Sequence, residues 1–472
     1  MSVALAPRAD VALGARDRLE ALCDPGTLQI IRSAVRSTAM GDKSRAGDGV
    51  LAGAGEVGGR PVFCYAQDPT YAGGSLGGQH AGSIVRVLEL ADRAGAPVVG
   101  FVSSGGARMQ EGIEALGGYG RIFHRIVRLS RRVPQISIIT GLSAGGGAYS
   151  PALTDWVVMT QASSMFLTGP GIVREALGED VSAEQLGGTR VHERNGVCHL
   201  VAPDDFAAAD LARELLAYLP AQVGDSAPRA TPRPPLAGDP GDHVPSEPRR
   251  VYDVRSVIAR LVDGGELFEV SGGWARNLVT GFARIDGRSV GVIANQPRWL
   301  GGVLDANSSQ KGARFVSQCD KFGIPLVVLV DTPGYMPGTR QESAGVIRFG
   351  ATLVHAFAQA TVARITVVLR KAFGGAYITM NSKDLGADYV FAWPEAEIGV
   401  MAAASAVGLI HRRELADATD PVALRSHLQA RYEEEHLQSA TAARTGYVDE
   451  LIEPRDTRGR LAWALESLAG GR

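Results

Sequence analysis

The apolar and polar positions of this 472-residue chain follow the same order of elements twice. In the first copy, two stretches at 50–57 and 61–65 flank Gly58-Gly59 and predict a β-hairpin, because glycine adopts the left-handed backbone of a tight turn without strain. A helical pattern over 84–94 leads to a short apolar run over 98–103, which is typical of a buried strand. A second helix at 121–131 and a second buried strand at 135–140 complete the copy.

The second copy follows at a near-constant offset along the chain. This repeat offset aligns Pro97 with Pro325, Gly106 with Gly334, and the GGAY at 146–149 with the GGAY at 374–377. Strands that alternate with helices predict an α/β layered domain, and the repeat predicts that this domain occurs twice. The corresponding elements are hairpin strands at 279–285 and 289–294, helices at 310–322 and 347–360, and buried strands at 326–331 and 364–369.

A proline-rich segment separates the two copies. Residues 223–250 contain seven prolines and show no apolar periodicity, which is the composition of a linker. We therefore predict two domains, 1–235 and 236–472.

Composition narrows the possible functions. The net charge is −2 and no long basic stripe is present, so a nucleic-acid partner is not expected. The apolar runs are too short to cross a bilayer, and the first ten residues lack the apolar stretch of a secretory signal. The four cysteines show no CxxC spacing and the nine histidines no HExxH pair, so no metal site is expected. These features predict a cytoplasmic protein without a membrane partner.

Glycine turns follow the buried strands of both copies at the same spacing. The separation between Gly106 and Gly146 equals that between Gly334 and Gly374. Small residues at such turns let a substrate carbonyl approach the backbone N–H groups, which can then stabilise negative charge on its oxygen. We therefore predict one oxyanion hole in each copy.

The residues around these turns resemble a known family. SGGAR at 104–108 is similar to a signature of acyl-CoA carboxylase β subunits, which are biotin-dependent carboxyltransferases of the crotonase-like superfamily. The resemblance covers nearly the whole chain and is closest to the single-chain actinobacterial type. It implies tandem ββα-superhelix domains of the ClpP/crotonase fold. Further similar motifs are PQISIITGLSAGGGAYSPALTD at 134–155, DTPGYMPGTRQ at 331–341 and KAFGGAYITMN at 371–381.

The resemblance also implies an activity and its site residues. The carboxyl group of carboxybiotin would move to the α-carbon of acetyl-CoA or propionyl-CoA, giving malonyl-CoA or methylmalonyl-CoA. One hole would hold the enolate oxygen of the thioester and the other the ureido oxygen of biotin. The resemblance places Gly145 and Gly146 at the thioester and Gly375 and Ala376 at biotin, with Gly106, Ala107, Gly147, Gly334 and Gly374 beside the two holes. CoA would be bound by Ser104, Gly105, Gly106, Ala107 and Arg108. Ile378 would set the acyl specificity.

Partners follow from the same resemblance. The chain has no AMKM-type biotinylation motif and no room for an ATP-using region, so a separate subunit would carry biotin and carboxylate it. Biotin itself would accept the α-proton, which explains why neither copy shows an obvious side-chain base. The family implies a homo-oligomer, usually a hexamer built as a trimer of dimers, with each active site formed by two subunits.

Three alternatives stay open. GLSAG at 141–145 fits the GxSxG elbow of serine hydrolases, which would make Ser143 a nucleophile. A biotin-dependent decarboxylase or transcarboxylase subunit would use the same holes in another direction. A non-catalytic scaffold of the complex is suggested by 343–352, where Ser343-Ala344 and Phe349 depart from the family pattern. In contrast, GAGEVG at 53–58 is followed by a strand and not a helix, which argues against a dinucleotide site.

Overall fold

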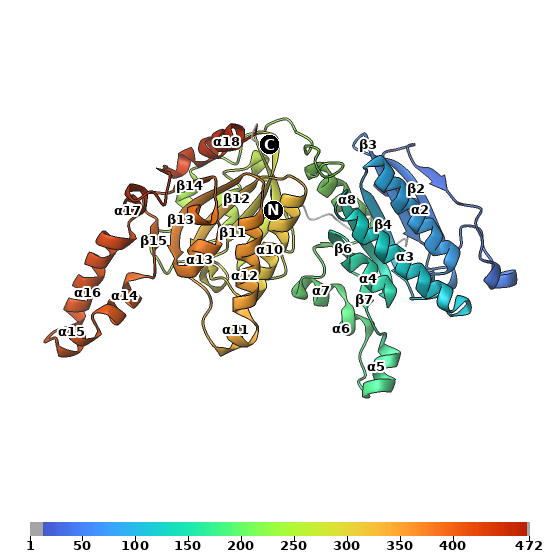
Figure 1. Cartoon of the computed structure of the whole chain (residues 1–472), viewed down its shortest axis with the longest axis horizontal. Helices are drawn as coiled ribbons and strands as arrows, with labels where there is room; N and C mark the ends of the chain where they lie inside the picture. Colours follow the sequence, from blue (N-terminus) through green and yellow to red (C-terminus); the bar gives the residue numbers. More distant parts are fainter. Residues whose placement is uncertain (1–12, 470–472) are drawn as a thin grey trace. The chain divides into compact units, whose positions relative to one another are not determined.

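The computed structural model describes residues 13–469 and divides the chain into two compact units, one ending at Pro228 and one starting at Arg229 (Figure 1). We call them the N-terminal and the C-terminal unit. The proline-rich residues 229–235 pack on the C-terminal unit, where Ala230 N–H donates to Gly287 O and Gly264 N–H donates to Pro234 O.

The N-terminal unit contains one eight-stranded sheet in the order β1-β2-β3-β4-β5-β6-β8, with β7 paired to β5. The predicted hairpin is antiparallel, and the strands from β3 onward run parallel. The strands are β1 (Gln29–Ile31), β2 (Val50–Val57), β3 (Arg60–Gln67), β4 (Val98–Ser104), β5 (Gln135–Ala144), β6 (Trp156–Thr160), β7 (Ser164–Phe166) and β8 (Leu200–Ala202).

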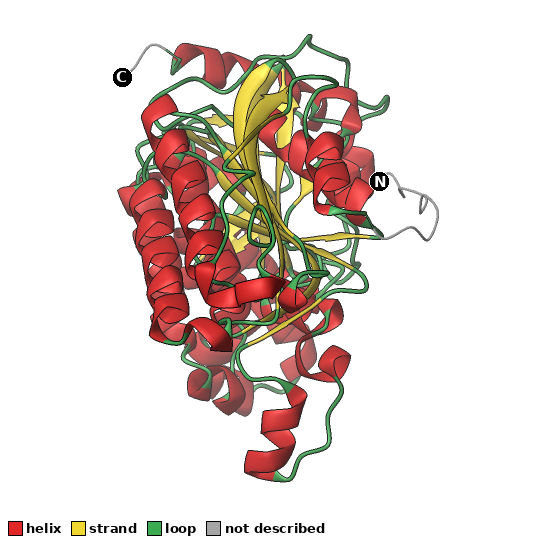
Figure 2. Cartoon of the chain, turned by 90° about the vertical axis from the view of Figure 1, so that its right-hand side faces the viewer, coloured by secondary structure: helices red, strands yellow, loops and turns green. Residues whose placement is uncertain are grey.

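Helices cover this sheet, as the red helices along the yellow strands in Figure 2 show. Helices α2 (Gly78–Ala94) and α3 (Ile113–Leu129) share one apolar core with the strands. Helix α1 (Ala15–Leu22) packs against β2 and β3, and α8 (Asp205–Tyr218) packs against β5, β6 and β8. Strand β4 is buried along its whole length, which accounts for the apolar run over 98–102.

The C-terminal unit repeats the sheet in the order β16-β14-β13-β12-β11-β10-β9, with β15 paired to β13. Its long helices α10 (Ala306–Lys321) and α12 (Val346–Gln359) correspond to α2 and α3. The strands are β9 (Phe268–Glu269), β10 (Leu278–Ile285), β11 (Arg288–Asn295), β12 (Leu326–Thr332), β13 (Arg364–Phe373), β14 (Tyr389–Ala392), β15 (Glu397–Gly399) and β16 (Glu450–Leu451).

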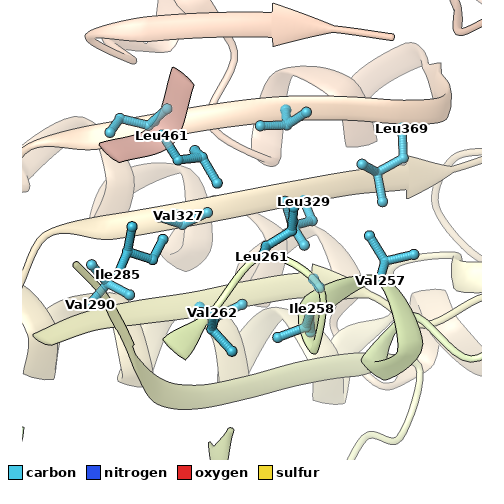
Figure 3. Packing of buried hydrophobic residues seen from close by; sticks show 14 of the residues in the cluster. Val257, Ile258, Leu261, Val262, Ile285, Val290, Val327, Leu329, Leu369 and Leu461 are labelled. Carbon is cyan, nitrogen blue, oxygen red and sulfur yellow. The ribbon is translucent and has the colours of Figure 1, made fainter. Parts of the chain in front are cut away.

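A large apolar cluster forms one side of this second sheet (Figure 3). Val257, Ile258 and Leu261 come from the segment before β9 and face Val327 and Leu329 on β12. Each fully buried aliphatic side chain contributes on the order of 1.5–3 kcal/mol relative to an exposed one. Strands alternate with helices in both units, which confirms the predicted α/β class.

The strand registers define the near-constant offset between the two copies more closely. Phe63 pairs with Val98 and Gly291 with Leu326, which preserves the repeat offset that aligns Pro97 with Pro325. Val98 pairs with Gln135, whereas Leu326 pairs with Arg364, so the offset grows by one from the second buried strand onward. One extra residue therefore lies between β12 and β13. The two GGAY segments, which match in sequence at the original offset, are out of register by one residue in the structure.

Candidate active site

The first glycine turn of the N-terminal unit follows β4. Gly105 N–H donates to Gly73 O, and Leu76 N–H donates to Gly106 O. Arg108 N–H donates to Leu76 O, so the turn is held on both sides of Ala107. Ala107 N–H itself has no acceptor among the described residues. The turn thus presents one unused backbone donor.

The second glycine turn follows β5. Gly145 has φ +58°, which favours glycine, and begins the short helix α4 (Gly146–Ala152). Gly145 N–H is already used, because it donates to Phe166 O at 3.1 Å. Gly146 N–H has no acceptor in the described part of the chain. The unused donor of this turn is therefore on Gly146 rather than on Gly145.

The two turns lie side by side. Ser104 and Ser143 are partners in the parallel ladder between β4 and β5. A Cβ atom on Gly106, at φ +100°, would lie 3.6 Å from Ala144 O. Two unused amides on adjacent turns can converge on one carbonyl oxygen, which is the arrangement that an oxyanion hole requires.

The C-terminal unit repeats this geometry. Leu304 N–H donates to Gly334 O and Met336 N–H donates to Leu304 O, which leaves Tyr335 N–H without an acceptor among residues 13–469. Gly374 has φ +60°, like Gly145, and starts α13 (Gly374–Thr379). Because the offset grows by one before β13, Gly375 corresponds to Gly146 and Ala376 to Gly147. Sequence reasoning missed Tyr335, although the repeat offset leads from Ala107 to it.

The second turns of the two units differ in how crowded they are. A Cβ atom on Gly146 would lie 2.6 Å from Cδ1 and Cγ of the Tyr119 ring, and one on Gly147 would lie 3.0 Å from Ser143 Oγ. A Cβ atom on Gly375 would meet nothing within 4 Å. Tyr119 OH and Ser104 Oγ are 3.1 Å apart, and burial raises the pKa of Tyr119. Its ring therefore supports the first pair of amides, whereas the second pair faces open space.

Ser143 does not have the environment of a nucleophile. Its side chain is buried, lies within β5 and not on the turn, and donates from Oγ to Gly147 O at 2.8 Å. An elbow serine would instead expose its hydroxyl to a substrate and contact a histidine. The geometry therefore argues against the hydrolase alternative and indicates that Ser143 shapes the turn.

The remaining predicted residues fall into two groups. Ile378 is 50% exposed and follows the second turn of the C-terminal unit, where it can contact a ligand. In contrast, the side chains of Ser104 and Arg108 are buried, and the Arg108 guanidinium is bonded to protein acceptors. Arg108 is thus not placed to contact CoA phosphates. Only backbone and small side chains of the 104–108 turn remain for that role.

Neither a metal centre nor a membrane span is found in the described part of the chain. Within residues 13–469, no three His, Cys, Asp or Glu side chains are grouped so that they could hold a metal ion. No described helix has both the length and the apolar composition that a membrane span requires.

Comparison with known proteins gives consistent matches. The carboxyl transferase domain family matches residues 10–471. The chain is 47% identical over 465 residues to the methylmalonyl-CoA carboxyltransferase 12S subunit of Propionibacterium freudenreichii subsp. shermanii, covering 97% of this chain and 89% of that protein. It is 48% identical over 479 residues to the propionyl-CoA carboxylase beta chain of Saccharopolyspora erythraea, covering 97% and 88%.

The fold matches a solved structure equally well. The crystal structure of transcarboxylase 12S, described as a hexamer with methylmalonyl-CoA and methylmalonic acid bound, superposes with a TM-score of 0.94. It is 47% identical and the match covers 97% of this chain and 90% of that one. This likeness confirms the predicted crotonase-like fold class.

Proposed function

The chain belongs to the carboxyl transferase domain family, and we propose that it moves a carboxyl group between carboxybiotin and the α-carbon of a short acyl-CoA. The observation that carries this proposal is a duplicated pair of backbone amides that have no acceptor among the described residues, Ala107 with Gly146 and Tyr335 with Gly375. Carboxyl transfer places negative charge on two oxygens, the enolate oxygen and the ureido oxygen of biotin. Two holes match two oxygens.

The N-terminal pair is assigned to the thioester. Ala107 and Gly146 N–H would donate to the carbonyl oxygen as the α-proton leaves, and each such donor contributes on the order of 10²–10³ in rate. The buried Tyr119 ring below Gly146 keeps this turn from moving when charge develops. CoA would run along the small residues 104–107.

The C-terminal pair is assigned to biotin. The open space at Gly375 and the small side chain of Ala376 leave room for a ureido ring. Carboxylated biotin, carried by a separate subunit, is a substrate here and supplies the CO₂ unit. Tyr335 and Gly375 N–H would hold its ureido oxygen. The half-exposed Ile378 would contact the acyl group and set its size.

The assembly and domain assignments rest on the same family. We propose that the halves 1–235 and 236–472 are the two carboxyltransferase domains, and that the chain forms a hexamer, because the solved relative is described as one. The direction of the reaction follows from the partner subunit. Relatives include both a carboxylase beta chain and a methylmalonyl-CoA carboxyltransferase subunit, and we propose that the two holes of this chain would suit either direction.

One experiment tests the proposal. The purified chain is mixed with a biotin-carrying, ATP-using subunit, ATP, labelled bicarbonate and a panel of acyl-CoAs. The label incorporated into acid-stable product is then measured. We expect malonyl-CoA or methylmalonyl-CoA. Absence of product with every acyl-CoA, together with no exchange of label between methylmalonyl-CoA and free biotin, would reject the carboxyltransferase assignment and favour a scaffold.

A further inference from the structure

A closed chain of buried hydrogen bonds brackets the first turn of the N-terminal unit. Ser103 N–H donates to Gln67 Oε1 at 3.1 Å, and Gln67 Nε2 lies 3.1 Å from His80 Nε2. His80 N–H donates to Asp48 Oδ2 at 2.8 Å, and Arg108 Nη1 donates to Asp48 Oδ1 at 2.6 Å. The backbone of residues 104–107 connects Ser103 to Arg108 and so closes the loop of bonds. We call this closed loop of hydrogen bonds the Arg108 ring. It therefore joins the residue before the turn to the residue after it.

Arg108 makes the most contacts in this ring. Its side chain is fully buried and its Nη1 also donates to Glu111 Oε1 at 2.8 Å, so we count Glu111 as part of the Arg108 ring. Its Nη2 donates to Asp48 O at 3.2 Å and to Ser75 O at 3.0 Å, and the guanidinium lies over the Tyr71 ring at 5.1 Å. Because protein groups surround it, the guanidinium holds neighbouring segments together and does not reach a ligand.

Helix α2 compensates part of the negative charge of the ring, although burial still raises the pKa of Asp48. Asp48 and Glu111 carry two negative charges against the one positive charge of Arg108. The first turn of α2 supplies further donors, since Gly78 N–H donates to Glu111 Oε2 at 2.6 Å and His80 N–H to Asp48. Carboxylates are stabilised at the N-terminus of a helix of this length. The ring thus fixes the 104–108 turn to the start of a long helix.

The C-terminal unit folds the same turn with only part of this ring. Asp331 N–H donates to Asn295 Oδ1 at 3.2 Å, as Ser103 N–H does to Gln67, but the charged members differ. At the repeat offset, Met336 stands in place of Arg108, Thr339 in place of Glu111, and Arg276 in place of Asp48. Arg276 is exposed and stacks over Trp299 at 3.5 Å. The backbone bonds of Leu304 that hold this turn are nevertheless the same as those of Leu76. The ring is therefore not needed to form the turn, which implies a more specific use.

We propose that Arg108 is a positioning residue that sets the direction of Ala107 N–H in the thioester-side hole. The inference rests on the proposed function, because it specifies how one of the two holes is held. Arg108 acts through the backbone of the adjacent residue and touches neither CoA nor the acyl group. It should therefore influence turnover and leave substrate affinity unchanged.

The test compares Arg108→Met, which installs the residue of the C-terminal unit, with Arg108→Lys and the matched control Arg132→Met. Arg132 forms an ion pair with Asp92 whose side chains are 54% and 44% exposed. We expect Arg108→Met to lower kcat by about 10²-fold, since misplacement of a donor by about 1 Å has this effect. KM for acyl-CoA should stay within about twofold of wild type. Arg108→Lys should retain more of the rate, and Arg132→Met should match wild type.

Two results would overturn the proposal. A rise in KM of about tenfold with unchanged kcat would show that Arg108 binds CoA, and unchanged kcat and KM would show that the ring does not position Ala107. Arg108→Met also removes the cationic partner of two buried carboxylates, which can unfold a protein. Arg108→Met combined with Asp48→Asn removes one of these charges, and Glu111→Gln tests the ring while Arg108 stays in place. Each should lower kcat at unchanged KM if the ring acts as proposed.

Hydrogen exchange separates this inference from the proposed function. Peptides covering 103–112 should exchange faster in Arg108→Met than in wild type, whereas those covering 331–340 should not change. If the wild type shows no carboxyl transfer, the proposed function fails. If exchange at 103–112 is the same in both proteins, the positioning inference fails, whatever the activity.

Discussion

Gly146→Ala tests the support of the thioester-side hole most sharply. The new Cβ atom would lie 2.6 Å from Cγ and Cδ1 of Tyr119 and 2.7 Å from Cδ2. Carbon atoms in contact are ordinarily about 3.5–4.0 Å apart, so either the ring or the turn must move by roughly 1 Å. The ring is only 5% exposed and packs on Phe123, with 5.8 Å between ring centroids. Because the ring is buried and packed on Phe123, the turn is expected to move.

The size of the effect follows from this displacement. Overpacking of a buried site costs about 1–3 kcal/mol of stability. Displacing a catalytic donor by about 1 Å lowers the rate about 10²-fold. We therefore expect Gly146→Ala to fold with a lowered Tm and to lose about two orders of magnitude in kcat. The assay is initial-rate carboxylation of free biotin by methylmalonyl-CoA, with thermal unfolding followed by circular dichroism.

Three matched variants make the interpretation specific. Gly375→Ala should keep the wild-type Tm, because its Cβ atom would meet nothing within 4 Å. In the Gly146→Ala background, Tyr119→Leu removes the ring and should recover part of the rate, whereas Tyr119→Phe keeps the ring and should not. The reasoning is refuted if Gly146→Ala retains kcat within about twofold of wild type, or if Tyr119→Phe rescues as well as Tyr119→Leu.

Three further predictions concern other parts of the site and core. Ser143→Ala should leave turnover largely intact and cost about 1 kcal/mol of stability through the lost hydrogen bond to Gly147 O; abolished turnover with a folded protein would favour a hydrolase. Ile378→Ala should shift the ratio of kcat/KM for longer over shorter acyl-CoAs by about tenfold or more, and an unchanged ratio would remove Ile378 from the acyl pocket. Burial lowers the pKa of Lys311 to about 7, below its value in the unfolded chain. The cost of burying its charge is thus fully present below pH 7 and is relieved as pH rises from 7 towards 10, by up to about 1.4 kcal/mol per pH unit. Urea unfolding at pH 7, 8 and 9 should show this gain in wild type and lose it in Lys311→Met; parallel profiles would contradict it.

The elements of the fold could largely be predicted from the sequence, because buried strands and amphipathic helices leave strong apolar patterns. The start of α2 was predicted too late, at residue 84 instead of Gly78. Its first amides are capped by Asp48 and Glu111, which lie far away in the sequence, so no local capping signal exists. In contrast, Asp305 and Ser308 form a capping box at the start of α10, which a closer reading of the sequence could have used.

The site was only partly predictable, and for a different reason. Glycine spacing identified the turns, but which amide stays unused depends on strand register. The extra residue between β12 and β13 is implied only by the positions of the predicted strands at 135–140 and 364–369, whereas the GGAY segments still match at the repeat offset of the first strands. Similarly, a lone SGGAR motif cannot show that Asp48 and Glu111 enclose Arg108. These are tertiary contacts that no local pattern encodes.

A structure with an acyl-CoA bound would test the central claim most directly. The quantity to measure is the distance from the thioester carbonyl oxygen to the backbone nitrogens of Ala107 and Gly146. We predict that both distances fall within about 2.7–3.1 Å, as for an oxyanion hole. A thioester oxygen bound elsewhere, with these two amides still unused, would contradict the account.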